Sequence, residues 1–275
     1  MDQVCPLPDD GEHRWMQESG RDLLSGGAII SNGVIKLGLF SEGALNAMGV
    51  GLIFMKPSGV EVESTYHGCP CEGWGASASR TSNGASFSGY ANNGRSTANI
   101  VSQPILSNGV TAFIDTTLAT GPLRVTHSYF PSPDTSNMYV ADVTYENTDS
   151  TETLTNLRYR RVMDWDIPPF LYNECVTIDV GTSNSVEAVS NSGFASTDPL
   201  LSVASGSTAS SYDIGPRDHG ALLQFLFKKP DDGALVTLAP GETFTFQILY
   251  GAAANKADAA QALANVGAEV SHLDL

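Results

Sequence analysis

Short segments in which hydrophobic and polar residues alternate recur along the chain after about residue 27, as expected for β-strands that turn one face toward a core. Turn-forming pairs such as Asn32-Gly33 separate these segments. One segment, Lys256 to Val266, has a helical pattern instead, with Asn255 as its expected N-cap. Strand patterns include Asn137 to Glu146, Ala221 to Phe227, Ala234 to Leu238 and Thr243 to Tyr250.

Many short strands with turns between them predict an all-β fold, an antiparallel β-sandwich with one short C-terminal helix. Residues 1–26 are polar and are interpreted as an N-terminal arm. Residues 27–275 are long enough to form a single large β-sandwich domain. The alternative is two β subdomains that divide near residues 130–150.

The stretch from Arg158 to Glu174 has the densest charge in the chain, and its first part separates into two faces when it is read as a strand that ends at Pro168-Pro169. Arg161 interrupts the apolar face, whose other members are Leu157, Tyr159, Met163, Trp165 and Ile167. The opposite face carries Arg158, Arg160, Val162, Asp164 and Asp166. If this strand forms a hairpin with the preceding one, Asp142 and Glu146 lie beside Arg158 and Arg160 as an ion-pair face.

Asp164 and Asp166 are also the candidate catalytic residues. Strand geometry separates them by roughly 7 Å, within the roughly 5–9.5 Å that glycoside hydrolases require between two carboxyl groups. Any acidic pair at this spacing on a strand meets the criterion, so ion pairing is the favoured interpretation. Trp74, in a Gly-rich segment, is the candidate exposed ring for stacking on a sugar.

The composition restricts the partners. With 14 Lys and Arg against 30 Asp and Glu, the net charge is -16, which disfavours nucleic acid and anionic lipid. No apolar run has the length of a membrane span, so no membrane insertion is expected, and no targeting segment is recognised. Asn147, Asp149 and Glu152 offer oxygen ligands for a weak calcium loop, and no other cofactor is expected.

Four cysteines favour an extracellular or other oxidising compartment. One residue separates Cys69 from Cys71, which disfavours a bond between them, so each is expected to pair with Cys5 or Cys175. The rival interpretation is a metal site at His67 to Glu72, although its cysteine spacing is unlike that of zinc sites.

Three stretches together resemble an uncharacterised family of exported bacterial β-sandwich proteins, many of which carry a PEP-CTERM surface-sorting tail. The resemblance implies export and a surface or matrix setting, and it implies no activity. The chain departs from the pattern because no apolar sorting segment precedes Leu275. The stretches are Cys69 to Gly75, Tyr159 to Asp166, and Tyr250 to Val270.

The first hypothesis is a non-enzymatic structural protein that self-associates in an extracellular matrix, a surface layer or a compartment-lining shell. The tail alternates at Val270 and His272, continues with the apolar pair Leu273 and Leu275, and is expected to add a strand to a neighbouring subunit's sheet. Few lysines and arginines are present to protect strand edges. The alternative is a carbohydrate-active enzyme or sugar-binding module that takes a polysaccharide at Asp164 and Asp166.

Overall fold

The computed structural model confirms the all-β fold with antiparallel sheets and one short C-terminal helix. It describes residues 26–69, 71–93, 96–168, 174–179, 183–203, 211–217 and 219–267. The arm predicted at 1–26 and the tail residues Val270, Leu273 and Leu275 therefore lie outside the described residues, apart from Gly26.

A six-stranded sheet forms one layer, in the order β17-β11-β10-β9-β7 with β8 also pairing to β9. Its strands are β7 (Ile100–Ser102), β8 (Leu106–Ser107), β9 (Ala112–Leu118), β10 (Leu123–Pro131), β11 (Met138–Asn147) and β17 (Thr243–Gly251). In β9 to β11 inward and outward residues alternate as the sequence predicts, since apolar side chains at every second position face the interior.

A five-stranded sheet forms the facing layer, in the order β14-β16-β12-β5-β6. Its strands are β5 (Glu72–Arg80), β6 (Ser86–Asn93), β12 (Leu154–Trp165), β14 (Val186–Ser190) and β16 (His219–Leu226). A separate pair consists of β13 (Glu174–Asp179) and β15 (Ser211–Arg217).

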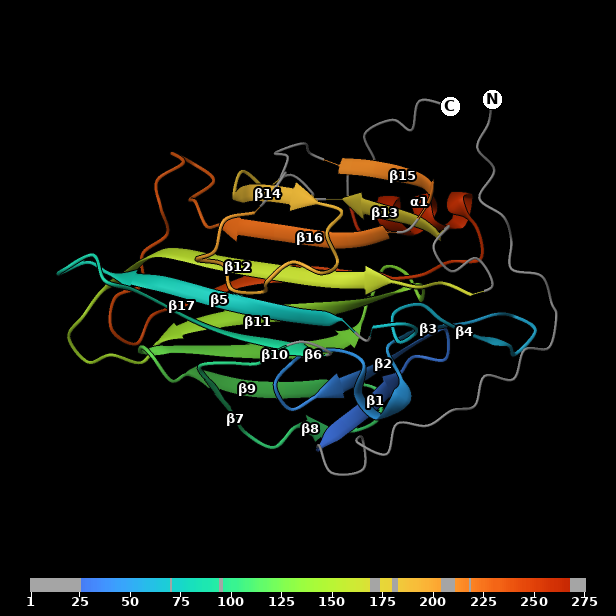
Figure 1. Cartoon of the computed structure of the whole chain (residues 1–275), viewed down its shortest axis with the longest axis horizontal. Coiled ribbons are helices and arrows are strands. Elements are labelled where there is room, and N and C mark those ends of the chain that lie inside the picture. Colours follow the sequence, from blue (N-terminus) through green and yellow to red (C-terminus); the bar gives the residue numbers. More distant parts are fainter. Residues whose placement is uncertain are drawn as a thin grey trace.

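A four-stranded sheet stands at one end of the molecule (Figure 1, blue). Its first two strands form the hairpin predicted at Asn32-Gly33, where Gly33 has a φ of 88°. The short helix η1 (Ala47–Gly49) lies between the second and third strands. The strands are β1 (Gly27–Ser31), β2 (Ile35–Phe40), β3 (Leu52–Met55) and β4 (Glu61–Glu63).

The inner face of the six-stranded sheet is shared between two cores. One core packs Val143 and Tyr145 against Tyr159 of the five-stranded sheet. The other packs Ile114 against Leu37 of the four-stranded sheet. The five-stranded and four-stranded sheets therefore both pack against the inner face of the six-stranded sheet.

Both large sheets combine early and late parts of the chain. β5 pairs with β12, and β11 pairs with β17. β10 and β11, which flank the 130–150 region, are neighbours in one sheet. The sheets thus join the segments on both sides of this region.

The predicted helix is present as α1 (Lys256–Asn265). The side-chain oxygen of Asn255 accepts a hydrogen bond from the Asp258 backbone N–H at 3.0 Å, which confirms Asn255 as the N-cap. Among the described residues, no helix has the length and apolarity needed to cross a membrane.

Candidate functional site

The two predicted faces of β12 are confirmed. Leu157, Tyr159 and Met163 are buried within the two cores. Arg161 shares this inward face, and only 5% of its side-chain surface is exposed. A guanidinium in such a position requires partners inside the protein.

Glu72 is the main partner of Arg161. Arg161 Nε donates to the Glu72 carboxylate, which is fully buried, and the second carboxylate oxygen accepts from the Leu45 N–H. Arg161 also donates to the Tyr159 hydroxyl at 3.2 Å and to the Gly43 carbonyl at 3.3 Å. The ion pair thus ties β12 and β5 to the segment that follows β2, where the three sheets meet.

Aromatic rings and one histidine enclose this pair. The Tyr250 ring centre lies 5.3 Å from the guanidinium carbon of Arg161, a cation–π distance. His127 Nε2 lies 3.2 Å from the Tyr159 hydroxyl. Burial, together with the nearby charge of Arg161, holds the pKa of His127 well below its ordinary value. All these groups are buried where the three sheets meet.

The predicted ion-pair face is wrong, because β11 and β12 belong to different sheets and do not form a hairpin. Arg158 pairs with Glu187 on β14 at 3.1 Å. Glu146 lies 3.3 Å from Arg124 of β10, and Asp142 accepts from Gln247 of β17. The alternation had fixed which face each residue occupies but not which strand lies next to it.

Arg160 holds a segment that we call the strap, residues 191–203, over the outer face of the five-stranded sheet. Its guanidinium donates to the carbonyls of Ser196 at 2.7 Å and Leu201 at 2.5 Å. Its Nε donates to the Gln224 side chain at 2.6 Å. Arg160 is therefore a buried anchor for the strap and forms no ion pair with Asp142 or Glu146.

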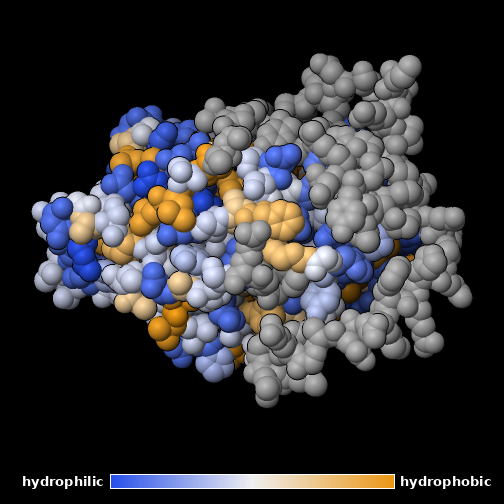
Figure 2. All heavy atoms as spheres, viewed as in Figure 1, coloured by the Kyte–Doolittle hydropathy of each residue, from blue (hydrophilic) through white to orange (hydrophobic). Residues whose placement is uncertain are grey.

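Glycine lets the strap approach the sheet. A Cβ at Gly75 would lie 2.0 Å from the Thr197 carbonyl oxygen, so only glycine fits beneath the strap without a shift. The strap exposes three large apolar residues, and Figure 2 shows orange atoms where it crosses the sheet. These residues are Phe194, Leu200 and Leu201.

Asp164 and Asp166 are buried, with 4% and 3% of their surfaces exposed. Their backbone N–H groups donate to the carbonyls of Cys71 and Ser64, both at 2.9 Å. Both carboxylates are therefore enclosed by the fold, and the catalytic alternative stays a hypothesis.

Trp74 is also buried, which contradicts its prediction as an exposed sugar-stacking ring. Its segment is strand β5 and not a loop. The indole N–H donates to the Glu42 carbonyl at 2.6 Å, and the ring stacks with Tyr159 at 6.1 Å. Glycine and alanine around Trp74 indicated a loop, but they are the small residues of a strand packed on both faces.

Cys69 and Cys71 form a disulfide with each other, so the prediction that each reaches a distant partner is wrong. The Cys71 N–H donates to the Cys69 carbonyl at 2.6 Å and closes a tight turn. This turn brings the two Cα atoms to 5.0 Å, within the range of disulfides. Cys5 lies outside the described residues, and the side chain of Cys175 is likewise not described.

The predicted calcium ligands make hydrogen bonds within their own turn and to a neighbouring one. Asn147 donates to the Glu152 carbonyl, and the Asp149 carboxylate accepts from the N–H groups of Thr151 and Glu152. Hydrogen bonds from the Thr151 and Glu152 N–H groups lower the pKa of Asp149. Glu152 itself accepts from the N–H of Ser82, in the turn that follows β5. The three side chains therefore brace the turn.

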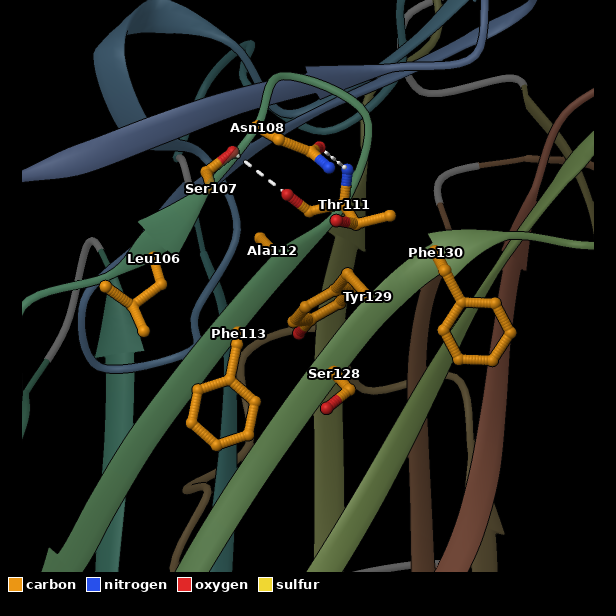
Figure 3. Close-up of a pocket in the computed structure, with 9 residues that line it drawn as sticks. All are labelled: Leu106, Ser107, Asn108, Thr111, Ala112, Phe113, Ser128, Tyr129 and Phe130. Atoms are coloured by element: carbon orange, nitrogen blue, oxygen red, sulfur yellow. Dashed lines mark hydrogen bonds between the residues drawn. The ribbon is translucent and has the colours of Figure 1, made fainter.

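A shallow groove of about 450 Å³ lies on the outer face of the six-stranded sheet (Figure 3). Phe113, 39% exposed, and Leu106, 66% exposed, project into it with Ser128 and Phe130. Asn108 accepts from the Thr111 N–H at 2.7 Å and shapes the end of the groove. Nothing in the sequence pattern marked this groove, because its residues come from three strands.

Within the described residues, no group of three or more His, Cys, Asp or Glu side chains is placed to hold a metal ion. In comparisons with known proteins, no family model matched the chain, and no curated protein did. The resemblance to the exported bacterial family therefore stays a prediction.

Proposed function

We propose that this chain is a non-enzymatic structural protein, an acidic β-sandwich that self-associates in an extracellular matrix, a surface layer or a compartment-lining shell. The observation that carries the proposal is the use of the charged residues on β12. Arg160 and Arg161 bind groups inside the fold, and Asp164 is buried beside them. The charge-dense strand stabilises the architecture and presents no reactive group to a substrate.

Exposed apolar side chains support an interaction role. Beyond the strap, apolar residues are exposed along the outer strands of the six-stranded sheet. Burial of such residues against another molecule is favourable, at about 25 cal/mol per Å² of apolar surface. They include Val101 on β7, Leu106 on β8 and Leu249 on β17.

A second candidate function is binding of a neutral polysaccharide in the groove. Phe113 and Phe130 place two rings on one open sheet face. Ser128 lies on the same face, opposite Phe113 on the neighbouring strand and two residues before Phe130. The volume falls within the roughly 300–1,000 Å³ of typical ligand sites. This candidate uses the groove and none of the residues Trp74, Asp164 and Asp166.

Negative-stain imaging of the purified protein, combined with a glycan-array screen, separates the two candidates. The structural proposal predicts ordered assemblies and no glycan above background. If the protein instead forms dispersed single particles and binds a glycan, and Phe113→Ala loses this binding, the second candidate function is favoured over the first. The Val101→Ala variant, altered on the same sheet but outside the groove, is the matched control.

A further inference from the structure

β17 is an edge strand with an unusual composition. Among the described strands it pairs with β11 alone, and it spans nine residues, Thr243–Gly251, without a charge or a proline. The other described edges are shorter, charged or partly covered. β14 has five residues and includes Glu187, β4 has three residues and two glutamates, and β6 exchanges hydrogen bonds with Ala98.

The register shows which backbone groups of β17 are free. The Ala252 N–H donates to the Asn137 carbonyl, and the Asn147 N–H donates to the Glu242 carbonyl, both at 3.1 Å. Hydrogen-bonded pairs recur at every second residue of an antiparallel ladder, so the even-numbered residues of β17 face β11. The odd-numbered residues direct their N–H and C=O groups away from the sheet. Within the described residues, no hydrogen bond uses these outward groups.

A row of free backbone groups pairs best with another strand. Self-pairing around a two-fold axis at Gln247 sets Thr245 opposite the partner's Leu249, so that the odd-numbered residues of both strands face each other. No charge opposes a like charge in this register, although the chain carries a net charge of -16. The uncharged β17 edge can therefore pair with a second copy of the chain, whereas the charged surfaces elsewhere on the protein would repel one.

We propose that β17 pairs antiparallel with β17 of a second copy and joins two six-stranded sheets into one continuous sheet. The proposal rests on the proposed self-association and names its interface. The resulting two-fold pair is the unit from which a layer is built.

Gln247→Pro tests the interface directly. Proline removes the outward N–H of Gln247 at the centre of β17 but leaves the hydrogen bonds to β11 intact. The matched control is Gln247→Ala, because both variants lose the hydrogen bond from Gln247 to Asp142 and only the proline loses the N–H. In sedimentation velocity at high salt, Gln247→Ala should associate like the wild type. Gln247→Pro should dissociate at least about tenfold more readily, since the symmetric interface loses the donor twice.

Hydrogen exchange on the wild-type chain gives an independent measurement if Gln247→Pro does not fold. The even-numbered amides of β17 should be protected under all conditions. The odd-numbered amides should exchange freely at low salt and low concentration, and become protected on association. Odd-numbered amides that are protected in the monomer would mean that another part of the chain covers this edge, which overturns the inference.

The outcomes also separate the inference from the proposed function. Association that is equal in Gln247→Pro and the wild type, without new protection at the odd-numbered amides, overturns the β17 interface and leaves self-association standing. A wild-type chain that stays monomeric at every salt concentration overturns both.

Discussion

Arg161 and Glu72 lie against each other inside the protein, and each is the main charged partner of the other. Removal of one member of a buried ion pair leaves an uncompensated charge in the core, which is costly. Surface pairs behave differently because water screens them. Lys36 on β2 and Glu61 on β4 form such a surface pair in the four-stranded sheet.

We expect Arg161→Met to lower the free energy of unfolding by about 3–5 kcal/mol, and Glu72→Leu to have a similar effect. The double variant should lose less than the sum of the two, because it leaves no unpaired charge. Lys36→Met, the surface control, should cost no more than about 1 kcal/mol. Urea unfolding of the wild type and these four variants measures these values. An Arg161→Met variant as stable as Lys36→Met would contradict the structural role of the pair.

At the scale of residues, the sequence indicates which face of a strand a side chain occupies better than it indicates which side chain it contacts. The apolar pattern of β12 placed Arg161 on an inward face, which signals a buried charge. Its partner Glu72 lies 89 residues away, and local periodicity contains no information about so distant a contact. The cysteine pairing was predicted wrongly because of a local contact rather than a distant one. Its geometry depends on one tight turn at Cys69, whose backbone hydrogen bond the spacing does not reveal.

At the scale of elements, alternation predicted β11, β16 and β17, and the helical pattern predicted α1, all close to their observed bounds. Strand neighbours were not predictable in the same way. β11 and β12 follow each other in sequence yet lie in different sheets, since the chain crosses between layers after Asn147. The groove and the strap contacts arise from this topology and were therefore out of reach of the sequence.

The strap provides a test of packing between elements. Gly75→Ala places a methyl group against the Thr197 carbonyl and should cost about 1–3 kcal/mol. Limited proteolysis should also become faster within 191–203, because the strap must move away from the sheet. Gly26→Ala, with nothing within 4 Å of its added Cβ, is the control. Equal cleavage of the two variants would show that the strap does not depend on this close approach.

At the scale of the whole molecule, charge and exposed apolar surface oppose each other. The net charge of -16 keeps copies apart at low ionic strength, whereas the apolar residues on the outer strands and the β17 edge favour contact. Screening shortens the reach of the repulsion from about 30 Å at 0.01 M salt to about 10 Å at 0.1 M. Self-association is therefore expected to strengthen as salt or divalent cations are added.

Light scattering across a salt series tests this account most directly. The measured mass should be near the 29.0 kDa of one chain at low ionic strength and should rise as salt is added at fixed protein concentration. Bovine serum albumin in the same buffers controls for non-specific aggregation. A mass of one chain at every ionic strength, with calcium as well as with sodium chloride, would contradict the proposal that this protein is a self-associating structural β-sandwich.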